Sequence, residues 1–117
     1  MKHVKLINQR TGEIIVNEAG IAANPWTRVI GLLLTKHLQH GRGLWLKPSN
    51  SIHTFGMRYS LDVLFLDKKN RVVEIVRNLR PNRVSPIVWK ARSVVELPAD
   101  SLSAVHLELN DQLIPAA

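Results

Sequence analysis

Residues suited to catalysis or binding gather in one stretch, residues 52–67, which reads IHTFGMRYSLDVLFLD. The second half of this stretch is an apolar run that burial explains. The first half places His53, Thr54 and Met57 where a core strand requires none of them. Alternation along an extended chain puts His53 and Met57 on one face and Thr54 on the other. We expect His53 to be partly enclosed, either as a structural histidine or as a ligand-binding or proton-transfer group.

Asp62 begins the apolar half of this stretch. A carboxylate in a hydrophobic strand is normally paired, because an isolated buried charge is costly. In the structural interpretation it forms an ion pair with Arg28, Arg58 or Arg83. In the catalytic interpretation Asp62 orients His53 as a general base, although no nucleophile or oxyanion hole is evident beside them. Catalytic residues therefore stay unassigned.

Other common site chemistries find little support. The five histidines are dispersed without HxH or HExxH spacing, so we expect no metal site and no cofactor. Gly41 and Gly43 frame Arg42, but this GxG lacks the third glycine of a phosphate-binding fingerprint and indicates a turn. The chain has no cysteine, which excludes disulfides, thiolate ligands and cysteine nucleophiles.

The chain is strongly basic, with 16 Lys and Arg against 9 Asp and Glu and a formal net charge of +7. Such a charge attracts nucleic acid, acidic lipid or anionic metabolites. Part of it gathers in one region: Arg71, Arg77, Arg80, Arg83, Lys90 and Arg92. A solvated basic face is the ordinary explanation. Phosphate contacts from this region, with base stacking on Trp89 or Trp45, would instead make a nucleic-acid interface.

The rest of the chain predicts the elements that position these residues. We expect an opening hairpin over residues 3–17, with turn chemistry at residues 10–13. A short helix is expected near residues 25–35, because Asn24 can cap it and Pro25 suits its first position. Further strands are predicted at residues 44–46, 52–57, 61–66, 71–77, 87–89, 93–97 and 105–109, with a tight turn at 67–70.

Short strands at intervals of roughly 8–12 residues favour a mainly β fold. We predict a compact antiparallel β-sandwich or barrel of many short strands with one short helix. The nearly continuous apolar run at 61–66 predicts burial on both faces of its strand.

The 117 residues, 45% of them hydrophobic, predict a single domain over residues 1–117. No window reaches the roughly 18 apolar residues that a membrane span requires. Lys5, Asn8 and Arg10 interrupt the N-terminal apolar residues, so a secretory signal is not expected and a cytoplasmic location is the default. The oligomeric state stays open.

Five blocks occur in a fixed order along the chain: TRVIGLL at 27–33, GRGLWL at 41–46, IHTFGMRYSLDVLFLD at 52–67, PNR at 81–83 and VVELPA at 94–99. With these blocks the chain resembles the domain-of-unknown-function 192 (DUF192) family over about residues 20–113. The resemblance implies a compact β-rich sandwich or barrel with a short helix. It also implies a family without an established biochemical activity.

The positions that match the family's motif are Arg28, Gly31, Leu32, His53, Thr54, Met57, Asp62, Phe65, Asp67, Pro81, Arg83, Glu96 and Pro98. Two positions depart from it, because Asp100 and Asn110 stand where the family has glycine. Asp and Asn tolerate left-handed geometry better than other non-glycine residues, so we expect altered turns and an unchanged fold.

The polar motif positions come from separate segments and could converge at one end of the sheet. The candidate ligand-binding residues are Arg28, His53, Thr54, Met57, Asp62, Arg83 and Glu96. The leading hypothesis is a small polar or anionic ligand bound beside His53, Met57 and Arg83, with no catalysis assumed. The alternatives are a hydrolase or lyase with His53 as general base oriented by Asp62, and a basic adaptor for nucleic acid or a protein partner.

Overall fold

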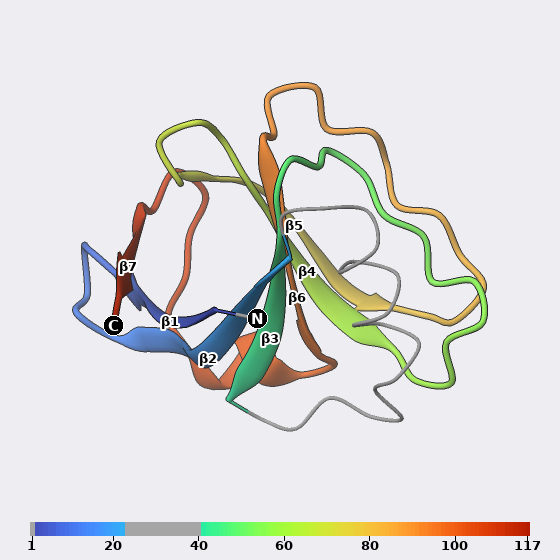
Figure 1. Ribbon diagram of the computed structural model, residues 1–117, viewed down its shortest axis with the longest axis horizontal. Coiled ribbons are helices and arrows are strands. Elements are labelled where there is room, and N and C mark those ends of the chain that lie inside the picture. The colour runs from blue at the N-terminus through green and yellow to red at the C-terminus, as the bar shows by residue number, and fades with distance from the viewer. Residues whose placement is uncertain (1, 23–40) are drawn as a thin grey trace.

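The computed structural model describes residues 2–22 and 41–117, in which the chain forms one curled, half-barrel sheet of seven strands (Figure 1). The strands are β1 (His3–Asn8), β2 (Ile14–Ala22), β3 (Arg42–Leu46), β4 (Leu61–Leu66), β5 (Val72–Leu79), β6 (Ser93–Pro98) and β7 (Leu113–Ala116), with a single 3-10 turn, η1 (Ser101–Ala104), among the described residues. Their order is β5-β4-β6-β3-β2-β1-β7, and neighbours are antiparallel except β2 and β3. The mainly β, mainly antiparallel fold is confirmed. The helix expected near residues 25–35 lies outside the described residues.

The inside of the curl holds the larger of two apolar cores. Val16, Trp45, Leu64, Val95 and Leu113 come from five strands, and each is at most 1% exposed. The one polar atom of the indole is satisfied, because Trp45 Nε1 donates to Ser93 Oγ at 2.9 Å. Side chains from sheet segments far apart in sequence therefore meet in this inner core.

The outer face of β4 and β6 is covered by two long connections, residues 47–60 and 80–92, which run side by side (Figure 1). Val63, Phe65 and Val94 point into this outer core and meet Ile52 and Ala91 from the connections. Because both faces are covered, every residue of β4 and β6 is buried. The two-sided burial predicted for residues 61–66 is confirmed.

The two edge strands of the sheet come together at one end. Arg71 and Gln112 form an isolated antiparallel bridge. The Val72 N–H donates to the Asp111 carbonyl at 2.8 Å, and the Leu113 N–H donates to the Asn70 carbonyl at 2.9 Å. The segment entering β7 is thus bonded to the start of β5, which covers part of both open edges.

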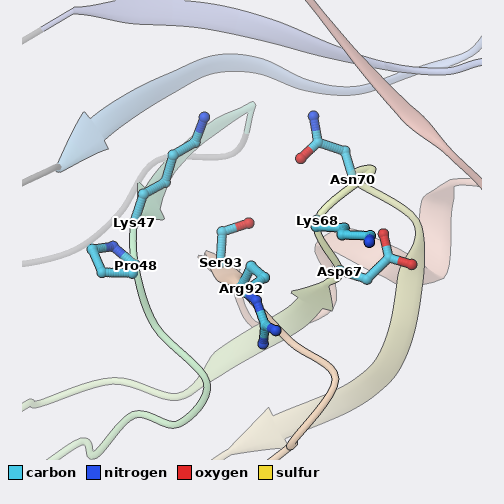
Figure 2. A pocket seen from close by; sticks show the side chains of 7 residues that line it. All are labelled: Lys47, Pro48, Asp67, Lys68, Asn70, Arg92 and Ser93. Atoms are coloured by element: carbon cyan, nitrogen blue, oxygen red, sulfur yellow. The ribbon is translucent and has the colours of Figure 1, made fainter.

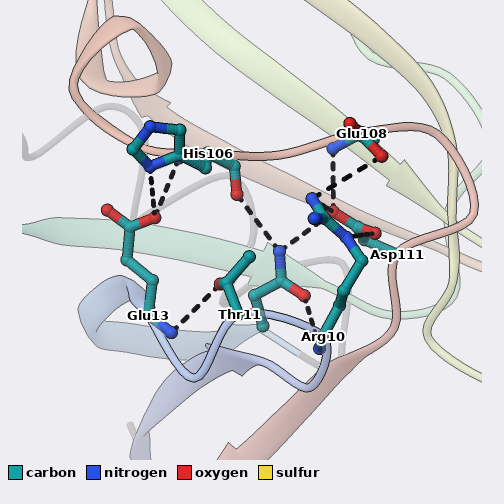
Figure 3. Close-up of polar contacts among 7 residues, drawn as sticks. Arg10, Thr11, Glu13, His106, Glu108 and Asp111 are labelled. Atoms are coloured by element: carbon teal, nitrogen blue, oxygen red, sulfur yellow. Dashed lines mark hydrogen bonds and ion pairs between the residues drawn. The ribbon is translucent and has the colours of Figure 1, made fainter.

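The side chain of Asp111 ties this closure to the opening hairpin (Figure 3). Its carboxylate accepts hydrogen bonds from Arg10 Nε at 2.7 Å, the Glu108 N–H at 2.8 Å and Asn8 Nδ2 at 2.9 Å. The hydrogen bond from Arg10 is the main cause that lowers the pKa of Asp111 well below its usual range. The carboxylate therefore stays ionised in the folded protein except in strong acid.

Local sequence patterns located most strands but misjudged three segments. The opening hairpin and the β4–β5 hairpin are confirmed. The strands predicted at 87–89 and 105–109 are wrong, because both segments are irregular. The strand predicted at 52–57 is reduced to one isolated bridge at His53, followed by a turn at residues 55–56. The strand β7 was not anticipated. Val88 and Leu107 pack against the outer and inner cores while their neighbours face solvent, and this alternation resembles that of a strand.

The two departures from the family motif behave as expected. Asp100 and Asn110 adopt φ values of 70° and 74°, in the left-handed region where glycine is otherwise favoured. Gly43, in contrast, belongs to β3 and not to a turn. A Cβ atom there would lie 2.8 Å from the Glu96 carbonyl oxygen, so the close approach of β3 and β6 requires glycine.

Replacing Asp111 by Asn should lower the free energy of unfolding at neutral pH by about 1–3 kcal/mol, since the buried Asn8 amide loses a charged acceptor. A depressed pKa stabilises the fold above the ordinary Asp pKa of about 3.9, and this stability is lost as the pH falls below it. Urea unfolding should therefore show wild-type stability declining between about pH 5 and pH 2, with a flatter profile for Asp111→Asn.

Glu108→Gln is the matched control, because the Glu108 carboxylate is 73% exposed and lies 3.7 Å from the same arginine. Its effect should stay below about 0.5 kcal/mol. Identical pH profiles for the wild type and Asp111→Asn would contradict the assignment.

Candidate functional site

The segment that contains His53 pairs with a distant segment to form a loop ribbon, residues 50–54 and 82–88. The Thr54 N–H donates to the Arg83 carbonyl at 2.8 Å, and the Ser85 N–H donates to the Ile52 carbonyl at 2.9 Å. His53 and Val84 lie opposite each other between these two bonds. Ile52, Thr54 and Ser85 are buried, whereas His53 and Val84 are exposed, so the loop ribbon has an inward and an outward face.

His53 lies on the outward face and is exposed, so the expectation that it is partly enclosed is wrong. Its ring stacks on Phe55 with centroids 5.0 Å apart and an interplanar angle of 26°. Its Nδ1 accepts from the Phe55 N–H at 3.3 Å. Met57, which alternation placed on the same face, packs half-buried against the outer core.

Thr54 is completely buried on the inward face and holds the turn between β5 and the loop ribbon. Its hydroxyl donates to the Arg80 carbonyl and accepts from the Arg83 N–H at 2.9 Å. Both hydrogen-bonding functions of this hydroxyl are therefore occupied by the backbone. Arg83 itself is exposed, and its guanidinium donates to the Asn82 carbonyl at 3.4 Å.

Asp62 points away from the loop ribbon. It alternates along β4 with Leu61 and Val63, which face the outer core, so its carboxylate faces the inner side. The carboxylate accepts from the Asn78 N–H at 2.9 Å and the Leu102 N–H at 3.1 Å. Among the described residues it has no ion pair, and the sheet separates it from His53. The geometry therefore does not bring His53 and Asp62 together.

Glu96 is fully buried in β6 and stands opposite Val63 of β4. Burial, and next the charge of Glu96, raise the pKa of the Tyr59 hydroxyl. Glu96 and Tyr59 are thus close enough to interact at the edge of the outer core. Arg28, the remaining candidate residue, lies outside the described residues.

A pocket of about 370 Å³ lies elsewhere, where β3 ends, β6 begins and the β4–β5 turn passes (Figure 2). Its described lining residues are Lys47, Pro48, Asp67, Lys68, Asn70, Arg92 and Ser93. We call it the Lys47 pocket. Sequence patterns did not reveal it, because its residues come from three separate segments that each look like an ordinary turn or strand end.

The indole of Trp45 positions two residues of the Lys47 pocket. Lys47 Nζ lies 3.3 Å from the centroid of the Trp45 ring, and Ser93 Oγ accepts from the indole N–H. Burial, and next the charge of Lys2, lower the pKa of Lys47. A cation whose pKa is lowered in this way gains from a nearby negative charge.

The carboxylate of Asp67 is already engaged within its own turn. It accepts from the Lys69 and Arg71 N–H groups, both at 2.9 Å, and from Arg71 Nε at 2.8 Å. Burial alone would raise the pKa of Asp67, but these hydrogen bonds outweigh it and lower the pKa. With Asp67 matched by Arg71, the charges of Lys47, Lys68 and Arg92 make the pocket electropositive.

The described residues form no cluster of three or more His, Asp or Glu side chains that could hold a metal ion. No helix in the same part of the chain is long and apolar enough to cross a membrane. The pocket that these residues do form has lysine, arginine, amide and hydroxyl groups, together with one carboxylate, Asp67, that is paired with Arg71. Such donors suit an anion better than a metal.

The sequence matches the model of the DUF192 family, described as an uncharacterized family, over residues 6–114. The UPF0127 protein of Thermococcus sibiricus is 31% identical over 113 residues, covering 92% of this chain and 72% of that protein. The UPF0127 protein of Pyrococcus furiosus is 30% identical over 111 residues, covering 92% of this chain and 95% of that protein.

Two crystal structures share the fold. A protein of unknown function from Novosphingobium aromaticivorans has a TM-score of 0.79 and 16% identity, covering 96% of this chain and 83% of that one. A Sinorhizobium meliloti protein, provisionally described as a transcription regulator, has a TM-score of 0.81 and 20% identity, covering 97% of this chain and 92% of that one. At these identities the likeness shows the fold alone.

Removing the hydroxyl of Thr54 should destabilise the protein, because the Arg83 N–H and the Arg80 carbonyl lose their partner. We expect Thr54→Val to lower the free energy of unfolding by about 1–3 kcal/mol, measured by urea denaturation. Thr54→Ser, which keeps the hydroxyl and loses one methyl group, should cost about 1 kcal/mol. Amide hydrogen exchange at Arg83 should accelerate in the Val variant only. Equal exchange in both variants would contradict this role.

Proposed function

The chain belongs to the DUF192 family, and we propose that it binds a small anionic ligand in the Lys47 pocket. One observation carries the proposal: Lys47, Lys68 and Arg92, from three separate segments, line one pocket whose described carboxylate is already matched by Arg71. Lys47 Nζ lies over the Trp45 ring and the Arg92 guanidinium donates to the Ala91 carbonyl, so no described carboxylate neutralises these two cations. A bound anion would supply the missing negative charge.

The other lining groups support the same class of ligand. Ser93 accepts from Trp45, so its own O–H remains able to donate, and the amide of Asn70 supplies a further donor. Figure 2 shows the side chains of Lys47 and Asn70 extending to the same side of the pocket. The volume of about 370 Å³ is near the lower end of the roughly 300–1,000 Å³ typical of small-molecule sites. A phosphate monoester or a small dicarboxylate has a suitable size and charge.

This proposal keeps the ligand class expected from the sequence and moves the binding site. His53 and Arg83 are exposed and Met57 packs into the outer core, so they support a pocket less well than Lys47 and Arg92. The hydrolase or lyase alternative has weaker support, because Asp62 faces the inner side of the sheet whereas His53 is exposed on the loop ribbon beyond the outer face.

Titration with inorganic phosphate, and separately with succinate, should shift the amide resonances of residues 47, 68, 70 and 93 in NMR spectra. Lys47→Met should weaken binding by about tenfold or more, because one charge-assisted contact is lost. Affinity should also fall as the pH rises through the pKa of Lys47, which lies below its ordinary 10.5, since the anion prefers protonated lysine.

Lys90→Met is the matched control, because it removes the same charge from an exposed lysine that is not among the lining residues. It should change the affinity by less than about twofold, as expected for a screened surface charge. Equal losses in the two variants, or shifts spread over the whole surface, would indicate general charge attraction and contradict a pocket.

A further inference from the structure

Large apolar side chains are exposed on the two connections that cover the outer core. They are Phe55 (56% exposed), Val84 (62%), Ile87 (55%) and Trp89 (78%). Single exposed apolar residues are ordinary, but several on adjoining segments mark an interaction surface.

The loop ribbon explains why these side chains face solvent. Its inward positions, Ile52, Thr54 and Ser85, are used to cover the outer core and to hold the ribbon together. Alternation therefore turns Phe55 and Val84 outward. Farther along the same connection, Val88 packs inward, while Ile87 and Trp89 on either side of it are exposed. We call these four outward residues the apolar ridge.

The apolar ridge lies within the most basic part of the chain. Residues 47–60 and 80–92 contain six Lys or Arg and no Asp or Glu, so they carry +6 of the net charge of +7. Two of these cations, Lys47 and Arg92, line the Lys47 pocket. The others, Arg58, Arg80, Arg83 and Lys90, are all exposed. Arg83 and Lys90 directly adjoin Val84 and Trp89 in the sequence, so a partner that covers these two apolar residues lies near positive charge.

We propose that the apolar ridge docks on an anionic lipid surface, with Ile87 and Trp89 entering the interface and the surrounding cations contacting lipid headgroups. Trp side chains suit the membrane–water boundary, because they combine a large apolar body with one N–H donor. Basic residues beside an anionic leaflet add electrostatic attraction. This inference goes beyond the proposed ligand pocket, because none of the four residues of the apolar ridge lines the Lys47 pocket.

Single-stranded nucleic acid would meet the same charge, but the ridge suits it less. Bases stack on flat aromatic faces, whereas Val84 and Ile87 are aliphatic. One face of the Phe55 ring is already stacked against His53. The acyl chains of lipids make favourable contact with aliphatic and aromatic side chains alike. A lipid surface therefore explains the composition of the ridge better than nucleic acid does.

The test measures sedimentation of the full chain with vesicles of phosphatidylcholine alone and of phosphatidylcholine mixed with phosphatidylglycerol, at low salt. We expect binding only to the mixed vesicles, accompanied by a blue shift of tryptophan emission that Trp89→Phe abolishes. The double variant Ile87→Ser, Trp89→Ser should bind at least about tenfold more weakly, since two buried apolar side chains are lost.

Leu109→Ser is the matched control, because Leu109 is 55% exposed, like Ile87, but lies outside both connections. It should bind mixed vesicles within about twofold of the wild type. The charge control compares two double variants. One carries Arg80→Gln and Lys90→Gln, within the basic connection, and the other carries Lys5→Gln and Lys69→Gln, outside both connections. Only the first double variant should reduce binding strongly. Urea unfolding checks that each variant is folded.

Absence of binding to mixed vesicles would overturn the proposal, and so would equal binding by the serine double variant and the wild type. Binding to fluorescent oligo(dT) without binding to vesicles would replace the lipid surface by nucleic acid. Should the double variant fail to fold, Trp89→Phe still decides, because an unchanged emission shift would place Trp89 outside the interface. Phosphate binding at the Lys47 pocket is measured separately, so either proposal can fail alone.

Discussion

The antiparallel pairing of β4 with β6 is the constraint on which the rest of the structure depends. Both strands are buried along their whole length, so each of their faces must be covered. The remaining strands curl to enclose one face, and the connections 47–60 and 80–92 cover the other. Because the strands curl around only one face of this strand pair, long connections have to cover the other face. The inward residues of these connections, such as Ile52 and Ala91, then become part of the outer core.

This arrangement explains why several residues that look functional in the sequence have structural roles. Asp62 accepts two backbone hydrogen bonds beside the inner core. The Thr54 hydroxyl donates one backbone hydrogen bond and accepts another beneath the loop ribbon. Each replaces a ladder bond that an irregular backbone segment lacks, and buried backbone groups rarely go without a partner. The outward residues of the connections hold no buried backbone group, so exposed aromatic, aliphatic and basic side chains are concentrated there.

Much of the fold follows from short patterns, whereas the contacts between distant segments do not. Hairpins with local turns were predicted correctly, and so were the left-handed positions of Asp100 and Asn110, because each depends on a few adjacent residues. The parallel pairing of β2 with β3 and the Lys47 pocket depend on which separate segments meet. The irregular residues 105–109 mimicked a strand, since alternate burial arises wherever an extended segment lies on a core.

The distribution of charge separates structural cations from those available for partners. Arg10 and Arg71 form close pairs with Asp111 and Asp67 at positions where turns must be held. The six cations of the two connections have no acidic residue within those connections, and their mutual repulsion opposes folding. Lys47 bears a separate cost, because burial, and next the charge of Lys2 from outside the connections, lower its pKa. Scattered ion pairs would keep a protein soluble with less repulsion. An anion bound beside these cations would relieve their repulsion, and both proposals, the anionic ligand and the anionic lipid surface, depend on this gain.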